Sequence, residues 1–342
     1  MKHAATVLLM LLVALAAQAE DSAKTLKIMQ LNTWRSGLQL PGAREGIAAQ
    51  IKKEKPHIVI MCECAVDGKV SEKVAELLAK DGLTYYYPKQ HNDCQVISTF
   101  PIIEEKPMSN QLKVTLDGGD LGRITVYSLH LNYRSYACYL PRGYDGNTWE
   151  KLPNGPVTSV EPVIAMNLAS RRHENIAQII KDAQPHLEAG EIVVLGGDFN
   201  EPSHLDWTEA TANLYGHNGI VMPWHTTRTL EDAGWIDVYR QKYPDPVTYP
   251  GFTFPCNNEN IAEKKLAWAP DADERDRIDF IFIPRTPKLA VRDAFLIGPE
   301  TMIVYGKRDS AKTKDRISTP ASVWPSDHRG NCAILDVFDS RP

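Results

Sequence analysis

Short apolar runs recur along the chain, and polar or turn-forming residues bound each of them. The runs are rich in β-branched and aromatic residues, a composition that is typical of buried strands. We therefore expect strands at residues 26–32, 57–63, 123–132, 192–198, 278–283 and 332–338.

Three segments between these runs have the apolar spacing of amphipathic helices. One begins after Gly42 and stops before Pro56, and a second runs from Ser71 and stops at Gly82, a residue that often follows a helix. The third, residues 170–184, places its isoleucines on one face. Strands with interposed helices predict an α/β or α+β sandwich whose sheets are covered by helices.

Two long polar segments interrupt this pattern, at about residues 133–166 and 203–275. Both contain many Tyr, Trp, Pro and Gly residues. Loops of this length in a compact domain are usually functional or disordered, and the aromatic content favours order. We expect one domain over residues 20–342, with these loops on its surface.

The N-terminus has the pattern of a secretory signal. Residues 1–19 place one lysine before a long apolar run and end in a small-x-small pattern, so cleavage is expected after Ala19. No later run is long enough to cross a bilayer. We therefore predict a secreted protein, and the shape of the signal best fits the bacterial periplasm.

Export would expose the six cysteines to an oxidising compartment. Cys138 and Cys256 both lie in the long loops, and we predict that they pair. Cys332, inside an apolar run, is expected to be a small core residue.

The formal net charge is -5, whereas a general nucleic-acid binder carries a basic face that neutralises phosphates. The charge argues weakly against such a binder, although a local basic patch is compatible with an acidic whole.

Polar side chains stand where the predicted strands begin and end. Where neighbouring strands run antiparallel, the end of one lies beside the start of the next, so these positions are expected to share one rim of the fold. The set comprises Asn32, Glu63, His130, Asp198, Asn200, Asp279, Asp327 and His328.

Such a rim suits metal-assisted attack on a phosphate ester. Mg²⁺ is commonly held by one or two carboxylates, and Mn²⁺ accepts similar oxygen ligands. Glu63 is the first candidate for this role, with Asn32 beside it as a neutral oxygen ligand. The ion would polarise a phosphoryl oxygen and screen the charge that develops on it.

The remaining rim residues suit activation of a water nucleophile. Asp198 is placed to orient and deprotonate water, and Asn200 to hold that water or a phosphate oxygen. His130 and His328 would donate to the non-bridging oxygens, while Asp279 fixes the tautomer of His328.

Six motifs, in this order, resemble those of the endonuclease/exonuclease/phosphatase superfamily: "LNTW" (31–34), "CEC" around Glu63, "SLHLN" (128–132), "GGDFNEP" (196–202), "RIDFIF" (277–282) and "SDH" (326–328). The resemblance covers about residues 26–338 and implies a four-layer α/β sandwich, with two central mixed sheets flanked by helices, and divalent-metal phosphoesterase chemistry. It matches the family's metal glutamate to Glu63, its Asp-x-Asn to Asp198 and Asn200, and its closing Asp-His to Asp327 and His328. We place Asp327 among the metal ligands.

The chain departs from the family pattern at two points, and one further match leaves a choice of residue. Trp34 stands where some members carry an acid, which puts a second metal ion in doubt. Thr99 stands where a basic residue is common. Asp276 is an alternative to Asp279, but Asp279 runs directly into the apolar strand and fits better.

Residues beyond the motifs offer substrate contacts. Arg35 and Arg134 are candidates to clamp a phosphate, or are solvated charges. Tyr133 and its neighbours are candidates for a stacking wall, or pack the loop onto the body of the protein. These neighbours are Tyr136, Tyr139 and Tyr144. Four histidines have no motif support and are expected to be structural: His57, His173, His186 and His217.

The sequence thus predicts a secreted Mg²⁺-dependent phosphoesterase whose substrate is a phosphodiester or phosphomonoester. A small-molecule or lipid-headgroup phosphodiester is preferred, because the chain is acidic and its long loops are aromatic. The alternatives are a secreted nuclease and a non-catalytic binding protein on the same scaffold. A fold and a metal site do not fix the substrate, so all three stay open at this point.

Overall fold

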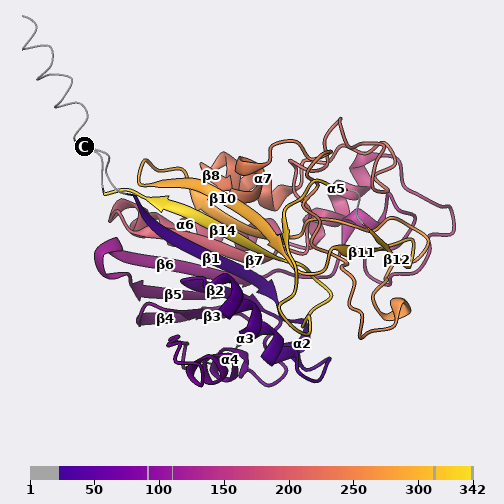
Figure 1. Cartoon of the computed structure of the whole chain (residues 1–342). Coiled ribbons are helices and arrows are strands. Elements are labelled where there is room, and N and C mark those ends of the chain that lie inside the picture. The colour runs from indigo at the N-terminus through magenta and orange to yellow at the C-terminus, as the bar shows by residue number, and fades with distance from the viewer. Residues whose placement is uncertain (1–22, 91, 110, 311–312, 340–342) are drawn as a thin grey trace, which may run out of the picture.

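A computed structural model of the chain describes residues 23–90, 92–109, 111–310 and 313–339. Two six-stranded mixed sheets lie at its centre (Figure 1). The first sheet has the strand order β13-β10-β14-β1-β2-β3. Its strands are β1 (Lys24–Asn32), β2 (Ile58–Cys62), β3 (Gln95–Ser98), β10 (Leu289–Ile297), β13 (Ile317–Ser318) and β14 (Gly330–Val337).

The second sheet has the order β4-β5-β6-β7-β9-β8. Parallel pairing of β6 with β7 and antiparallel pairing of β7 with β9 place the chemically important strands in its middle. Its strands are β4 (Ile102–Met108), β5 (Gln111–Asp117), β6 (Arg123–His130), β7 (Ile192–Asp198), β8 (Trp235–Asp237) and β9 (Asp279–Pro284).

The two sheets share one aliphatic core. Ile28 and Ile60 of the first sheet belong to the same buried cluster as Val126 and Val194 of the second. Gly196 allows the sheets to approach closely, because a Cβ at that position would lie 3.0 Å from the Ile60 Cδ1 atom. Burial of aliphatic surface from both sheets is therefore the main force that joins them.

Helices cover the outer faces, so the fold has four layers. The first sheet is covered by α3 (Ala43–Glu54) and α4 (Val70–Ala79), and the second by α6 (Arg172–Glu188) and α7 (His225–Asp232). Figure 1 shows α3 and α4 on the opposite side of the sheets from α6 and α7. The predicted four-layer α/β sandwich is confirmed.

The long loops gather with α5 (Val160–Ala169) at one end of the sandwich (Figure 1). They are ordered, as their aromatic content predicted, around a buried cluster of their own that includes Tyr139, Trp207 and Trp224. We call the loop residues packed on this cluster the loop shell. The other elements are α2 (Trp34–Gly37), α8 (Val238–Lys242) and the hairpin of β11 (Thr301–Val304) with β12 (Lys307–Ser310).

Two expectations need comment. The predicted Cys138–Cys256 disulfide is wrong, because the two residues are separate buried thiols. Cys138 packs in the loop cluster, whereas Cys256 packs on the outer face of the first sheet. The predicted signal, residues 1–19, lies outside the described residues. Within the described ranges, no helix combines the length and apolar character that a membrane span requires.

Candidate active site

The strand register brings the predicted rim residues together. His130 pairs with Asp198 across β6 and β7, and Asp198 pairs with Asp279 across β7 and β9. Asn32 pairs with Cys62 in the first sheet, which places Glu63 directly beyond it. One edge of both sheets therefore carries these residues, as the motif positions predicted.

Asn32 joins the two sheets at this edge. Its amide nitrogen donates to Glu63 Oε1 at 3.1 Å and to Asp198 Oδ2 at 3.0 Å. Its oxygen accepts the Trp34 backbone N–H at 2.9 Å, and that contact fixes which way the amide faces. In this orientation Asn32 positions two carboxylates, so a metal-ligand role for its oxygen stays a prediction.

Glu63 is held by an unusual turn. Its φ is +57°, and the Arg35 backbone N–H donates to its Oε2 at 2.9 Å. Arg35 itself has a φ of +54°. Left-handed backbone at non-glycine residues is strained and is concentrated at functional sites. The Arg35 N–H, which lies in the turn after β1, thus orients the Glu63 carboxylate toward the rim.

Asp198 lies buried at the centre of the rim. Its Oδ2 atom is 3.9 Å from the Nε2 atoms of both His130 and His328. Burial and the neighbouring charge of Asp279 raise its pKa to about 6. Its Oδ1 accepts the Asn200 backbone N–H at 2.8 Å, and the Asn200 side chain donates to a main-chain carbonyl, that of Leu131, at 2.9 Å.

Asp93 supports His130 and was not predicted. Its carboxylate lies 2.6 Å from His130 Nδ1. Burial alone would lower the pKa of His130, but the bond to Asp93 and the charge of Asp198 raise it to about 9. Asp93 lies just before β3 without a motif of its own, so only an unpaired acid near a strand start could have pointed to it.

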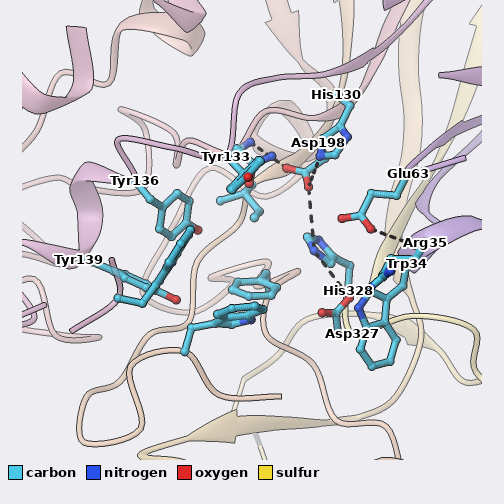
Figure 2. Close-up of a pocket in the computed structure, with 15 residues that line it drawn as sticks. Trp34, Arg35, Glu63, His130, Tyr133, Tyr136, Tyr139, Asp198, Asp327 and His328 are labelled. Atoms are coloured by element: carbon cyan, nitrogen blue, oxygen red, sulfur yellow. Dashed lines mark hydrogen bonds and ion pairs between the residues drawn. The ribbon is translucent and has the colours of Figure 1, made fainter. Parts of the chain in front are cut away.

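Asp279 supports His328 in the same way. Its Oδ2 lies 2.8 Å from His328 Nδ1, and its Oδ1 accepts from the Gln30 amide at 2.9 Å. Burial opposes the imidazolium form of His328, yet the Asp279 charge and hydrogen bond raise the pKa to about 10. Both histidines therefore present Nε2 toward Asp198, as Figure 2 shows.

Asp276, the alternative acid, has a structural position. It pairs with the fully buried Arg142 and accepts from the Trp207 indole N–H at 3.0 Å. These contacts fix the loop shell and leave Asp279 at the rim, where the sequence placed it.

Asp327 carries a buried oxygen without a hydrogen bond. The residue is 5% exposed, and its Oδ1 atom has no hydrogen-bond partner among the described residues, although His328 Nε2 lies 3.9 Å away as an ion-pair partner. Burial raises the pKa of Asp327 to about 7, against the lowering effect of the His328 charge, and the charge of Glu63 adds to the rise. A buried unpaired carboxylate oxygen is costly unless a cation or a proton satisfies it.

Two sets of atoms could hold that cation. Asp198, Asp279 and His328 have ligand atoms within 4.8 Å of one another. However, the raised pKa of His328 and its bond to Asp279 make it a hydrogen-bond donor rather than a ligand. Glu63 and Asp327 are better suited, because the Asp327 Oδ1 atom accepts no hydrogen bond and hard cations prefer carboxylate oxygens.

A cavity of about 240 Å³ opens beside these residues. Tyr133, Tyr136 and Tyr139 line it, and so does Arg35. Tyr144 does not line it and packs behind, with its ring centroid 6.5 Å from that of Tyr139. Four further aromatic side chains that the sequence analysis did not select also line the cavity: Trp34, Trp149, Phe254 and Trp268.

The other candidates lie elsewhere. The Arg134 guanidinium lies 5.4 Å from the Tyr133 ring centroid and is not part of the cavity wall. The four histidines without motif support also lie outside that wall: His57, His173, His186 and His217.

Comparison with known proteins identifies the family. The sequence profile of the Endonuclease/Exonuclease/phosphatase family matches residues 29–328. The chain belongs to this family of metal-dependent enzymes, which hydrolyse phosphoester bonds. It is also 26% identical, over 310 residues, to an uncharacterized protein of Caenorhabditis elegans, covering 89% of this chain and 88% of the relative.

Several solved structures resemble the chain at low sequence identity. D. rerio TDP2 complexed with a single-strand DNA product is 14% identical, with a TM-score of 0.50, over 92% of this chain and 100% of that chain. An AP endonuclease from Archaeoglobus fulgidus is 16% identical, with a TM-score of 0.49, over 92% of this chain and 100% of that one. An endonuclease/exonuclease/phosphatase from Beutenbergia cavernae is 18% identical, with a TM-score of 0.49, over 92% and 72% of the chains.

Proposed function

We propose that the protein is a secreted Mg²⁺- or Mn²⁺-dependent phosphodiesterase that cleaves a small-molecule or lipid-headgroup phosphodiester by in-line attack of water. The observation that carries this proposal is the position of Asp198. Its carboxylate lies 3.9 Å from each of two imidazole Nε2 atoms, in the wall of an aromatic cavity. A base flanked by two hydrogen-bond donors suits the attack of water on a phosphoryl group.

The rim residues divide the chemistry among themselves. Asp198 accepts the proton of the attacking water, and Asn200 orients that water or a phosphate oxygen. His130 and His328, held by Asp93 and Asp279 respectively, donate from Nε2 to the non-bridging oxygens as charge builds there. Each histidine is fixed by a carboxylate, so little reorganisation is needed during the reaction.

Glu63 and Asp327 are the residues that would hold the divalent ion. Their carboxylates are close enough for Glu63 to raise the pKa of Asp327, and the Asp327 Oδ1 atom accepts no hydrogen bond from the described residues. When bound, the ion would act as a Lewis acid that polarises the phosphoryl oxygen. Asn32 keeps Glu63 and Asp198 in register whether or not its own oxygen turns to the ion.

The size of the cavity favours a small substrate over a polymer. The cavity of about 240 Å³ has an aromatic wall, and Arg35 is the one arginine or lysine among the described residues that line it. The net charge is -5, which does not help a protein to follow a nucleic-acid backbone. Export depends on the predicted signal at residues 1–19 and is part of the same proposal.

Hydrolysis of a substrate panel tests the proposal. We expect turnover of bis-p-nitrophenyl phosphate and of at least one small or lipid-headgroup diester, loss with EDTA, and recovery with Mg²⁺ or Mn²⁺. Faster cleavage of plasmid DNA or RNA, with steep salt dependence, would establish the nuclease alternative instead. Tight binding of esters without turnover under every metal condition would leave a binding protein on this scaffold.

A further inference from the structure

Exposed aromatic rings form a strip along the cavity. The Tyr133 and Trp149 rings are stacked with centroids 6.1 Å apart, and the Trp149 and Trp268 centroids are 5.6 Å apart. Tyr133 remains 50% exposed and Trp268 46% exposed. Because all three line the same cavity, a continuous apolar surface is available there for a ligand to cover.

Trp149 is held in this strip by a constrained turn. Its φ is +60°, a left-handed conformation that bulky residues rarely adopt. The Trp149 backbone N–H donates to the Asp145 carbonyl at 3.0 Å. The Asp145 carboxylate accepts from the backbone N–H groups of Asn147 and Thr148 at 2.8 and 2.9 Å. The turn is fixed by its own hydrogen bonds, so the indole is already in place at the cavity.

Tyr136 brings a buried polar atom to the cavity wall. It is 5% exposed, and the partner of its hydroxyl is the Cys138 thiol, which is only a weak hydrogen-bonding group. Tyr139 lies on the same side of the cavity as Tyr136, across from Glu63 (Figure 2). By contrast with Tyr136, its hydroxyl donates to Glu274 at 2.6 Å. A buried hydroxyl that meets only a thiol is weakly satisfied, so a polar ligand atom would be a stronger partner.

We propose that the cavity binds a planar aromatic group of the phosphoester substrate, and that Tyr136 selects rings that carry a hydrogen-bonding atom at their edge. The inference rests on the proposed function, because the ring would be placed by a cavity that also contains Asp198 and His328. Stacking on Tyr133, Trp149 and Trp268 supplies the affinity for the ring. The Tyr136 hydroxyl supplies the discrimination.

A quaternary ammonium headgroup suits aromatic walls as well, but it fits this cavity less well. It has no hydrogen-bonding atom for the Tyr136 hydroxyl. The Arg134 guanidinium already lies 5.4 Å from the centre of the Tyr133 ring, so a cation is already present at this end of the strip. A neutral planar ring avoids both penalties.

Calorimetric titration of the Asp198→Asn variant in Mg²⁺ measures binding without turnover. Thymidine monophosphate and deoxyribose phosphate differ only by a base, and phosphotyrosine and phosphoserine differ by a phenol ring. We expect the aromatic member of at least one pair to bind about 5- to 150-fold more tightly, the range that ring stacking gives. A preference confined to the first pair identifies a nucleobase, and one confined to the second identifies a phenol.

Substitutions in the same background locate the binding. Trp268→Leu and Tyr133→Leu should abolish most of the preference and leave deoxyribose phosphate binding unchanged. Tyr305→Leu is the matched control, since Tyr305 is 59% exposed and does not line the cavity. Tyr136→Phe removes only the hydroxyl and should weaken thymidine monophosphate binding by about 2- to 10-fold, the effect of one lost hydrogen bond.

Equal affinities within both pairs would overturn the proposal. Phosphocholine is titrated in the same way, and the proposal is also wrong if phosphocholine binds most tightly. A preference that Trp268→Leu and Tyr133→Leu leave intact would place the ring elsewhere. An unchanged thymidine monophosphate affinity in Tyr136→Phe would remove the role of that hydroxyl. Failure of the wild-type protein to hydrolyse any ester would instead overturn the proposed function, and these affinities do not depend on hydrolysis.

Discussion

The sheet sandwich and the loop shell are stabilised in different ways. The core between the sheets is aliphatic and needs no polar partners, as in the contact of Ile60 with Gly196. The loop shell combines aromatic rings with buried charges such as the Arg142–Asp276 ion pair. A hydrophobic core tolerates many sequences that keep its pattern, whereas the shell depends on specific partners far apart in the chain.

The sheet sandwich and the loop shell also supply different parts of the proposed active site. The ends of the sheet strands supply the residues proposed to carry the chemistry, including His130, Asp198 and Asp279. The loop shell supplies most of the aromatic wall, including Tyr136 and Trp268. Changes at the rim should therefore affect turnover with little change in stability, and changes in the shell should affect local stability and substrate choice.

Asp198→Asn should have the largest effect on activity. It removes the proposed base while keeping the size of the side chain, so we expect kcat to fall by about 10²- to 10⁴-fold. The fold should remain intact, because burial already raises the pKa of Asp198 and an amide avoids the cost of a buried charge. Steady-state kinetics and thermal unfolding measure the two effects separately.

The matched control is Asp309→Asn, on the exposed strand β12. It should leave kcat and the melting temperature unchanged. Near-wild-type turnover by purified Asp198→Asn would remove Asp198 from the mechanism, and a large drop in its melting temperature would show that the rim also stabilises the fold.

The sequence was sufficient to predict the rim because its residues stand at strand ends. An acid or amide directly after a buried apolar run, as at Glu63 and Asp198, has no role in packing the core and therefore indicates a residue of the site. Asp93 was missed because it supports His130 from a segment without a motif. Eight of the fourteen described strands were also missed, and two of these have clear local reasons: β4 is largely exposed, and β10 has a register shift between Val291 and Asp293 that breaks its alternation.

The loop shell could not be predicted in the same way. Tyr139 bonds Glu274 across 135 residues of chain, and Arg142 pairs with Asp276 across 134. No local spacing encodes such partners. The aromatic content of these segments indicated order, but it could not show that Tyr144 packs behind the wall.

Arg142→Met should give the largest loss of stability. The Arg142 side chain is fully buried, and its removal leaves the Asp276 charge without its cation. Breaking a buried pair from one side costs about 3–5 kcal/mol. Denaturant unfolding measures the total loss, and hydrogen exchange should show faster opening of the loop shell than of β1 or β7.

Arg228→Met provides the comparison. Arg228 also pairs with a carboxylate, that of Asp232, but its side chain is 54% exposed. An exposed pair contributes at most about 1 kcal/mol. Equal losses from Arg142→Met and Arg228→Met would contradict the view that buried charges hold the shell.

His217 makes the stability of the shell depend on pH. Its ring stacks on Trp207 with centroids 3.7 Å apart, and burial together with Arg142 lowers its pKa from 6.5 to about 2. Below pH 6.5 the unfolded chain binds a proton that the native ring refuses, so stability falls as pH decreases. The loss is about 1.4 kcal/mol per pH unit in this window.

His217→Phe keeps a ring on Trp207 and removes the titration. Between pH 7 and about pH 5, wild type should therefore lose about 2 kcal/mol more than the variant in denaturant unfolding. This range lies above the usual pKa of exposed carboxylates, which limits their contribution. Parallel pH profiles for the two proteins would show that His217 is not held neutral.

Ile60→Val should have the smallest effect, and the effect should be global. Ile60 lies in the core between the sheets, and loss of its Cδ1 atom costs about 0.5–1.5 kcal/mol without an unpaired polar group. Kinetics and hydrogen exchange in the loop shell should be unchanged apart from this global shift.

The Ile60 Cδ1 atom would lie 3.0 Å from a Cβ at position 196. Gly196→Ala should therefore be less destabilising in Ile60→Val than in wild type. Equal costs in both would show that another contact, such as the Phe280 carbonyl of the neighbouring strand β9, limits the space for a Cβ at position 196.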